Sequence, residues 1–338
     1  MADPKTEETA KDKDKAQKKG ASGSHVPFDR NFQIDFTKEI EDYAPDPLKA
    51  YEVIPTGNQT GSFYALICEP HLTPRVHAAQ AYSGVANPAS NRLVSAGVVA
   101  VPILRQQRYC FIYENNLGRP ICNSNYGIAL GWKPDRVLEK VVAPVMSVLK
   151  DFHNVDLVHG AICPTNMFNG GKEDFSSIIV GDCLSVPAFS RQPAIFESPD
   201  RMMATATGRG EATPQYDLYS LGVTLAMMLR SIDPLEGLTD DQIYTRKIQN
   251  GTYASMFSNA DRFSGAILEL LRGLMQDDPA SRWTVDEALA WMDGRRLSPK
   301  QPTKIRKAGR ALSMAEHEYN YPQTLVRDMF KTQSDAIK

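Results

Sequence analysis

The sequence predicts an α+β protein in which a small antiparallel sheet precedes a helical domain. The first half contains segments such as "SFYALICEP" and "QRYCFIYE", which are rich in aromatic and β-branched residues and are bounded by Gly, Asn and Pro. The later segment "DLYSLGVTLAMMLR", which begins at Asp217, is apolar on nearly all sides, as expected of a helix at the centre of a helical domain. A chain of 338 residues is long enough for two subdomains of this kind.

The composition divides the chain into four parts. Residues 1–27 mix lysines with acids and contain almost no apolar side chain, which predicts a disordered arm. Residues 28–125 form the sheet-rich part, and residues 126–294 form the helical part. In residues 295–338, seven Lys and Arg side chains precede the first acid, so this segment is predicted to be a separate basic tail with a short helix.

Two helices of the second part are predicted in detail. From Asp135 onward, five apolar residues share one face of a helix: Leu138, Val141, Val142, Val145 and Leu149. A last helix is expected to start at Thr284, because Glu287 follows three residues later and completes a capping box.

Composition also limits the classes of function. The net charge of −2 gives no global reason to expect nucleic-acid binding. The longest uncharged apolar stretch, roughly Val94 to Leu104, is far shorter than the ~20 residues that cross a bilayer. The first 25 residues lack the apolar core of a secretory signal, so we expect a cytoplasmic protein without a membrane span. The five cysteines are odd in number and lack C-x-x-C spacing, which predicts free thiols.

Five short phrases in the second half follow one another in a characteristic order. They are "HGAICPTNMF", "IIVGDCLS", "ESPD", "DLYSLGV" and "DDPASRWTVDEAL". In this order the chain resembles the protein kinase superfamily from about Arg108 to Met292. Taken one by one in that order, the five phrases are similar to five features of the family. These are the catalytic loop, the metal-binding strand and turn, the end of the activation segment, the start of the central helix, and the closing loop and helix. The resemblance implies a bilobal kinase-like fold with a reduced antiparallel β N-lobe and a helical C-lobe.

The catalytic groups of the family are missing from the small lobe. Phosphoryl transfer in kinases needs a strand lysine paired with a glutamate from a helix. There is no lysine between Tyr51 and Trp132, and neither Asp nor Glu occurs from Pro70 to Tyr113. The resemblance places Cys68 where the lysine would be. The activating ion pair is therefore not expected to form.

Two further catalytic features differ from the family. Gly57 and Gly61 lie a few residues before Cys68, whereas the family has another strand between its glycine-rich loop and this position, so a tight hairpin is expected here. In the catalytic loop, the resemblance places Ala161 at the general base and Cys163 at the lysine. An alanine cannot accept a proton.

Two candidate cofactor-binding residues remain. The resemblance matches Asn166 with the loop asparagine and Asp182 with the aspartate that binds a metal ion. Residual binding of ATP and Mg²⁺ through these two residues is one interpretation. The other is that Asn166 is a turn residue and Asp182 caps the end of a strand.

The residues that hold the family's fold are present. The resemblance implies that Asp200 pairs with Arg282. It also implies that Asp217 accepts the backbone N–H groups around His159 and Gly160. Charges that hold the fold are thus retained, while those that perform chemistry are absent.

The leading interpretation is a catalytically inactive kinase-like protein, a pseudokinase, that acts as a cytoplasmic docking or scaffold module in signalling and needs no cofactor. The alternative is a divergent ATP-dependent kinase or nucleotide-using transferase with a rewired cleft. The partner is expected to be a protein, and the tail at 295–338 adds an acidic partner or a nucleic acid as candidates. The resemblance also places Cys68, Cys163 and Cys183 in one cleft, where they either fill space or form a redox or soft-metal site.

Overall fold

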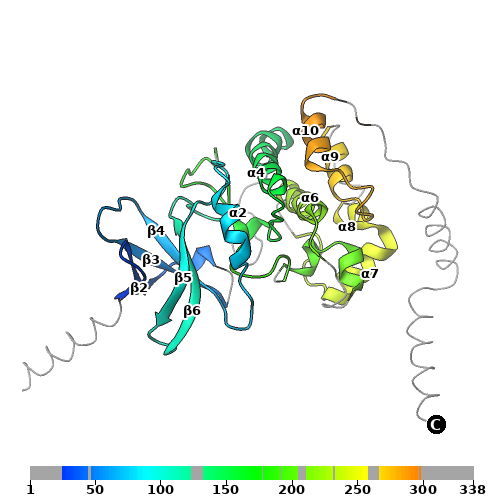
Figure 1. The fold of residues 1–338 in the computed structure, drawn as a ribbon. Coiled ribbons are helices and arrows are strands. Elements are labelled where there is room, and N and C mark those ends of the chain that lie inside the picture. Colours follow the sequence, from blue (N-terminus) through cyan, green and yellow to red (C-terminus); the bar gives the residue numbers. More distant parts are fainter. Residues whose placement is uncertain are drawn as a thin grey trace, which may run out of the picture. The chain divides into compact units, whose positions relative to one another are not determined.

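The three-dimensional structure of the chain is a computed structural model (Figure 1). It describes residues 25–44, 47–122, 132–176, 178–190, 192–204, 211–230, 233–257, 266–295 and Leu297. The chain divides into two compact units, Met1–Arg296 and Leu297–Lys338, and every element below belongs to the first. The predicted disordered arm up to residue 24 and the predicted basic tail from residue 298 lie outside the described residues.

The strands of the first half form one antiparallel sheet with the order β1-β2-β3-β4-β6-β5. They are β1 (His25–Pro27), β2 (Phe32–Glu39), β3 (Lys49–Pro55), β4 (Phe63–Ile67), β5 (Leu93–Val101) and β6 (Gln106–Glu114). A small separate pair is made by β7 (Met167–Phe168) and β8 (Ile179–Val180).

The two faces of the main sheet bury different side chains. Ile34, Ala65 and Ile112 belong to an apolar cluster on one face. Leu66 and Phe111 point to the other face and join the core of the helical half. Successive residues of a strand point to opposite faces, so one sheet supports both cores.

The first strand begins inside the segment predicted to be disordered. β1 pairs antiparallel with β2, and the His25 Nε2 atom lies 3.2 Å from Asp35 Oδ2. Val26 packs against the apolar cluster of the sheet. The predicted disorder is therefore wrong for His25–Pro27, because these residues gain a β-partner that local composition does not reveal.

Gly57 and Gly61 lie in the hairpin that connects β3 with β4, as predicted. Their φ angles are +67° and +123°, a region that glycine adopts without strain.

The helices of the second half surround a central helix, α6 (Figure 1). In chain order they are α3 (Pro134–Val137), η3 (Leu138–Val142), α4 (Ala143–Asn154), α5 (Pro199–Met203), α6 (Pro214–Arg230), α7 (Asp240–Asn250), α8 (Thr252–Met256), α9 (Ala266–Leu274) and α10 (Val285–Met292). The short α-helix α2 (Ala79–Ser83) lies in the first half between β4 and β5. No helix of the described residues combines the length and apolarity that a membrane span requires.

The helix predicted from Asp135 is present but contains a π-helical turn, η3. Pro144 lies in the first turn of α4 and has no N–H to donate to the carbonyl of Lys140. The wider π turn accommodates this missing bond. Val145 and Leu149 are fully buried, as the periodicity predicts.

The other two helix predictions are confirmed as well. α6 is buried from Asp217 to Leu229. α10 follows Thr284, whose hydroxyl accepts the N–H of Glu287, while the Glu287 carboxylate accepts the N–H of Thr284. The predicted α+β architecture, a small antiparallel sheet followed by a helical half, is the observed one.

Candidate functional site

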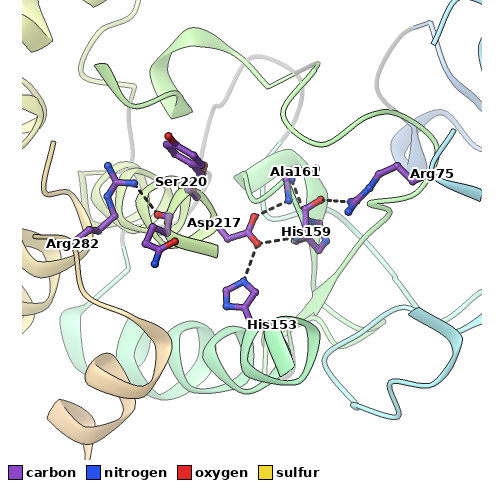
Figure 2. Close-up of polar contacts among 10 residues, drawn as sticks. Arg75, His153, His159, Ala161, Asp217, Ser220 and Arg282 are labelled. Atoms are coloured by element: carbon purple, nitrogen blue, oxygen red, sulfur yellow. Dashed lines mark hydrogen bonds and ion pairs between the residues drawn. The ribbon is translucent and has the colours of Figure 1, made fainter. Parts of the chain in front are cut away.

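The carboxylate of Asp217 fixes the loop that begins at His159. Asp217 lies in the first turn of α6 and is fully buried. Its Oδ2 atom accepts the N–H of His159 at 2.8 Å, and its Oδ1 atom accepts the N–H of Gly160 at 2.7 Å. In Figure 2 His153 also points at this carboxylate, with Nε2 3.1 Å from Oδ2. The two predicted hydrogen bonds are confirmed, and His153 is a partner that the sequence did not reveal.

Gly160 is held in a conformation that suits glycine alone. Its φ angle is +73°, and a Cβ atom here would lie 2.5 Å from the Cβ of Ala188. The Gly160 carbonyl accepts the N–H of Phe189 at 2.8 Å. The loop and the segment after Asp182 are therefore in direct contact, and there is no room for a side chain at this position.

The imidazole of His159 points inward and is neutral. Its Nδ1 atom accepts the N–H of Ala161 at 3.2 Å, and its Nε2 atom lies 3.4 Å from the carbonyl oxygen of Gly181. These contacts fit the tautomer that carries its proton on Nε2. Burial lowers the pKa of His159 to about 4, although the charge of Asp217 acts in the opposite direction.

The free energy of unfolding is expected to fall as the pH decreases from 6.5 towards 4. His159 has a pKa of about 4 in the folded chain against 6.5 as a model value, so within this window the unfolded chain binds a proton that the folded chain does not. Stability then decreases with decreasing pH, by about 2 kcal/mol at a pH near 5. Urea unfolding of the wild type and of His159→Asn at pH 6.5 and near pH 5 measures the contribution of His159 to the free energy of unfolding. His77→Asn is the control, because His77 is exposed. An equal pH dependence in the wild type and His159→Asn would contradict it.

Ala161, which the resemblance places at the general base, has no side-chain proton acceptor. Its carbonyl oxygen accepts the Nδ2–H of Asn166 at 3.0 Å, and the same Nδ2 atom donates to the carbonyl of Asp182 at 2.9 Å. A Cβ atom at Gly181 would lie 2.2 Å from Asn166 Oδ1, so that oxygen is packed against the backbone. Asn166 therefore joins the loop to the end of β8.

The carboxylate of Asp182 is occupied by protein donors. Tyr113 donates its hydroxyl to Oδ1 at 2.6 Å, and the N–H of Leu184 donates to Oδ1 at 3.0 Å. The N–H of Ser185 donates to Oδ2 at 3.1 Å, and the Ser185 hydroxyl donates to the same oxygen. A carboxylate has about four acceptor sites. Asp182 therefore uses its acceptor capacity to hold its own turn and the sheet.

In this arrangement the oxygens of the two candidate cofactor residues face protein groups. Magnesium is bound through carboxylate oxygens that face an open position. The oxygens of Asp182 face Tyr113 and Ser185, and the oxygen of Asn166 faces Gly181. Among the described residues, no group of three or more His, Cys, Asp or Glu side chains could hold a metal ion.

Three buried tyrosines line the sheet beside Asp182, and sequence analysis did not find them. The rings of Tyr64 and Tyr113 are stacked with centroids 5.5 Å apart. Tyr82 of α2 meets Tyr113 edge-on at 6.3 Å and donates its hydroxyl to the carbonyl of Asn91. Burial raises the pKa of all three phenols, which stay neutral donors.

A fourth tyrosine comes from the connection between β2 and β3. Tyr43 lies in the short helix η1 (Glu41–Tyr43), and its ring contacts Tyr64 at 5.0 Å and Phe168 at 5.6 Å. Its hydroxyl donates to Asn115 Oδ1 at 2.8 Å. The resemblance places the glycine-rich loop in this connection, one strand ahead of the strand that ends at Cys68. Residues 40–48 contain no glycine.

Cys68 directly follows β4 and is buried. Its N–H donates to the carbonyl of Tyr109 at 2.9 Å, which continues the sheet pairing. Burial raises the pKa of the Cys68 thiol, and the negative charge of Asp182 acts in the same direction. A small neutral side chain thus occupies the position expected for the lysine.

All five cysteines are buried free thiols. Burial raises the pKa of Cys163 and Cys183 as it does that of Cys68. Metal binding and redox chemistry need the thiolate, which burial disfavours. The structure therefore favours the packing interpretation of these three residues.

Arg75 joins the sheet half to the loop that contains His159. Its guanidinium donates to the carbonyls of Cys183 at 2.9 Å and His159 at 3.3 Å, and Figure 2 shows it reaching the loop from the side opposite Asp217. Its own N–H donates to the carbonyl of Leu184 at 2.8 Å. One cation thus links the sheet half to both the loop and the segment that follows Asp182.

The predicted ion pair between Asp200 and Arg282 is not among the ion pairs of the described residues, and this prediction is wrong. Tyr216 donates its hydroxyl to Asp200 Oδ2 at 2.6 Å. Arg282, which is fully buried, donates to the carbonyls of Gln276 and Gln215, both at 2.9 Å. Its guanidinium lies 5.7 Å from the centre of the Tyr216 ring. The tyrosine therefore contacts both charged groups and takes the place of their direct contact.

Lys247 of α7 is a fully buried cation that sequence analysis did not identify. Its Nζ atom donates to the carbonyls of Ala194 at 3.2 Å, Ile195 at 2.7 Å and Glu197 at 2.7 Å. Burial lowers its pKa to about 7, and the nearby Asp277 opposes this shift. Lys247 ties α7 to the segment that leads into α5.

Comparison with known proteins supports the kinase resemblance. Residues 129–292 match the family of the protein kinase domain. The structure of Rad53 residues 1–466 in complex with AMP-PNP matches with a TM-score of 0.56 at 17% identity, over 74% of this chain and 63% of that chain. The second half of the chain is thus similar to a protein kinase domain. The predicted kinase-like fold, with an antiparallel N-lobe and a helical C-lobe, is confirmed.

The chain is also distantly similar to curated serine/threonine kinases. A calcium and calcium/calmodulin-dependent serine/threonine-protein kinase of Pisum sativum is 26% identical over 48% of this chain and 31% of that protein. The corresponding kinase of Oryza sativa subsp. japonica is 26% identical over 52% of this chain and 37% of that protein. A probable serine/threonine-protein kinase, pXi, of Dictyostelium discoideum is 25% identical over 46% of this chain. The matched part thus spans about a third of the length of the two plant kinases.

Proposed function

We propose that this chain is a pseudokinase: a catalytically inactive kinase-like protein that serves as a regulatory or docking module for a protein partner. The arrangement around Asp182 carries the proposal. The residue that corresponds to a metal ligand gives its carboxylate to Tyr113, Leu184 and Ser185. A group engaged in this way stabilises the fold and has little capacity left for a metal ion.

The remaining catalytic positions support the same conclusion. Phosphoryl transfer depends on positioned charges that grip the phosphates and on a group that accepts the hydroxyl proton. Ala161 carries no acceptor, and Cys68 is a buried neutral thiol whose pKa is raised. Loss of the general base alone costs about 10²- to 10⁴-fold in rate. Loss of the strand lysine lowers the rate further, because the charge on the phosphates is no longer stabilised.

The packing near Asp182 also argues against nucleotide in the usual pose. The connection between β2 and β3 holds Tyr43 against Tyr64 and Phe168 rather than a flexible glycine loop. Backbone N–H groups of glycines normally cradle phosphates. Here the same connection presents a phenol that is hydrogen-bonded to Asn115.

Phosphoryl transfer by the purified full chain is expected to stay at background. Labelled ATP with Mg²⁺ or Mn²⁺ would be supplied with a general acceptor protein, and incorporation compared with that of an Asn166→Ala, Asp182→Ala double variant. Ala161→Asp is expected to leave activity at background too, because the lysine and its acidic partner remain absent. Labelling by the wild type that disappears in the double variant would favour the alternative, a divergent kinase or transferase with a rewired cleft.

A thermal-shift measurement tests nucleotide binding separately. A ligand present at a hundred times its dissociation constant stabilises the folded state by about 2.7 kcal/mol and would raise the melting temperature by roughly 5 °C or more. We expect no such rise with millimolar ATP, with or without Mg²⁺. A rise that is lost in the double variant would show binding through Asn166 and Asp182.

A further inference from the structure

A groove of about 560 Å³ lies on the helical half, between the segment Asp135–Ala143, the start of α9 and the end of α10. We call it the α9–α10 groove. α10 packs against both α4 and α9, and Figure 1 shows α9 and α10 side by side. The volume is in the range of sites that take a ligand. Asp182 and the described residues of the loop at His159 do not line it, so it is separate from the candidate site.

Apolar side chains line much of the α9–α10 groove. Leu138, Trp291 and Met292 pack against the main core but are only partly buried, and the rest of their surface faces the groove. Ala143 of α4 and Ala266 of α9 are small and leave the space open. An aromatic ring beside aliphatic side chains offers contact area to an apolar group of a ligand.

The same groove carries an excess of negative charge. Asp135, Glu139 and Glu269 line it together with one cation, Arg295, and all three acids are exposed. Asp135 and Glu139 are four residues apart in α3 and η3, which follow each other without a break, so about one helical turn separates them. The groove therefore combines apolar contact area with carboxylates at a regular spacing.

Contacts within the fold use only part of these carboxylates. The Trp291 indole N–H donates to Glu269 Oε2 at 3.0 Å. Glu139 Oε1 lies 2.6 Å from Nζ of Lys140, in a pair whose Glu139 side chain is 71% exposed. Asp135 lies in the first turn of α3, where an acid stabilises the start of the helix. A carboxylate has about four acceptor sites, so all three retain capacity for donors from another molecule.

We infer that the α9–α10 groove docks a basic amphipathic helix of the protein partner. The inference rests on the proposed function as a docking module. The carboxylates repel phosphate groups, which disfavours nucleic acids and anionic membranes as ligands. The apolar lining favours a ligand that brings apolar side chains over a purely polar cation. A helix with Lys or Arg four residues apart matches Asp135 and Glu139, and its apolar face then meets Trp291 and Met292.

Binding of a model peptide to the full chain tests this inference. The probe is a fluorescein-labelled peptide of Leu, Lys and Ala with about 14 residues, or four helical turns, and its anisotropy measures binding. We expect the affinity to fall about tenfold in a Glu139→Gln, Glu269→Gln double variant, because two exposed charge pairs are lost. Glutamine keeps the shape of both side chains and an acceptor oxygen for Trp291.

Matched controls separate docking in the groove from general attraction to negative charge. A Glu52→Gln, Glu114→Gln double variant removes the same charge from the sheet, where these acids pair with Lys38 and Arg92, and is expected to bind like the wild type. Ala266→Arg places a bulky cation in the groove and is expected to abolish binding. A peptide with Glu in place of Lys is not expected to bind.

A benzophenone group on the apolar face of the peptide locates the contact, since this photoreactive group inserts readily at methionine. We expect an adduct at Met292, detected by mass spectrometry, and none at Met203, which is 60% exposed on α5. Absence of binding by the wild type would overturn the inference, as would equal affinities of the two double variants or equal labelling of the two methionines.

Two other outcomes have distinct meanings. Binding that appears only after Lys304, Arg306 and Lys307 are replaced by Gln in the full chain would overturn the inference, because the groove would then take a segment of this chain. Phosphoryl transfer by the wild type would contradict the proposed function without changing where the peptide binds, and loss of peptide binding would leave the proposed lack of catalysis in place.

Discussion

Replacing Asp217 by alanine is expected to lower the free energy of unfolding by about 3 to 5 kcal/mol. The buried carboxylate accepts two backbone N–H groups, from His159 and Gly160, and contacts His153. Without it, two buried donors lose their acceptors, and each such loss costs about 1 to 3 kcal/mol. The loop at Gly160 would also lose its anchor to α6.

Chemical denaturation of the purified chain measures this effect. Asp286→Ala is the matched control, because Asp286 is exposed and pairs with Lys150 on the surface, where an ion pair contributes about 0.5 kcal/mol. Asp217→Asn keeps one acceptor oxygen and is expected to fall between the wild type and Asp217→Ala. A loss below about 1 kcal/mol for Asp217→Ala would show that the loop does not depend on this carboxylate.

Replacing Lys247 by methionine is expected to lower the free energy of unfolding by about 2 to 3 kcal/mol near neutral pH. The methionine preserves most of the volume but removes the Nζ donor from the carbonyls of Ala194, Ile195 and Glu197. Lys150→Met, on the surface, is the control and is expected to change little.

The effect of Lys247→Met should also depend on pH. In the folded chain burial lowers the pKa of Lys247 to about 7, against 10.5 as the model value. Between these values the unfolded chain binds a proton that the folded chain does not, so this lysine contributes stability that increases with pH. The stability difference between the wild type and Lys247→Met should therefore grow from pH 7 to pH 9, by about 1 kcal/mol per pH unit. A constant difference would mean that Lys247 keeps its proton in the folded chain.

The fold could be predicted because its signals are local or lie in short phrases. The capping box at Thr284 and the uniformly apolar stretch after Asp217 specify their helices without reference to the rest of the chain. The π turn before Pro144 is also a local effect, although periodicity alone did not predict it. The strand at His25–Pro27 could not be found, because its stability comes from pairing with β2.

The candidate site could be predicted only where one residue decides the chemistry. Ala161 and Cys68 exclude a proton acceptor and a lysine by identity alone. Engagement of Asp182 by Tyr113 joins positions that are 69 residues apart, and no sequence pattern relates them. The expected pairing of Asp200 with Arg282 was wrong for a similar reason, since it treated the two charges without the tyrosine that contacts both.

Lys247 was missed because its surroundings in the sequence look like an exposed surface. The helix "DDQIYTRKIQN" is largely polar, and a lysine in such a helix is normally solvated. Its burial follows from the approach of the segment Ala194–Phe196 to α7, which depends on the tertiary fold. Buried cations that bond to backbone carbonyls leave no counter-ion pattern for sequence analysis to detect.

The close contact at Gly160 has an evolutionary consequence under the proposed function. Any other residue at this position would place its Cβ atom 2.5 Å from that of Ala188, in a backbone conformation that L-residues rarely adopt. A lineage with this loop could acquire an aspartate at Ala161 by one substitution, but a side chain at position 160 would require the neighbouring segment to move first. Intermediate sequences would then be less stable without a gain in activity, so selection would not favour them.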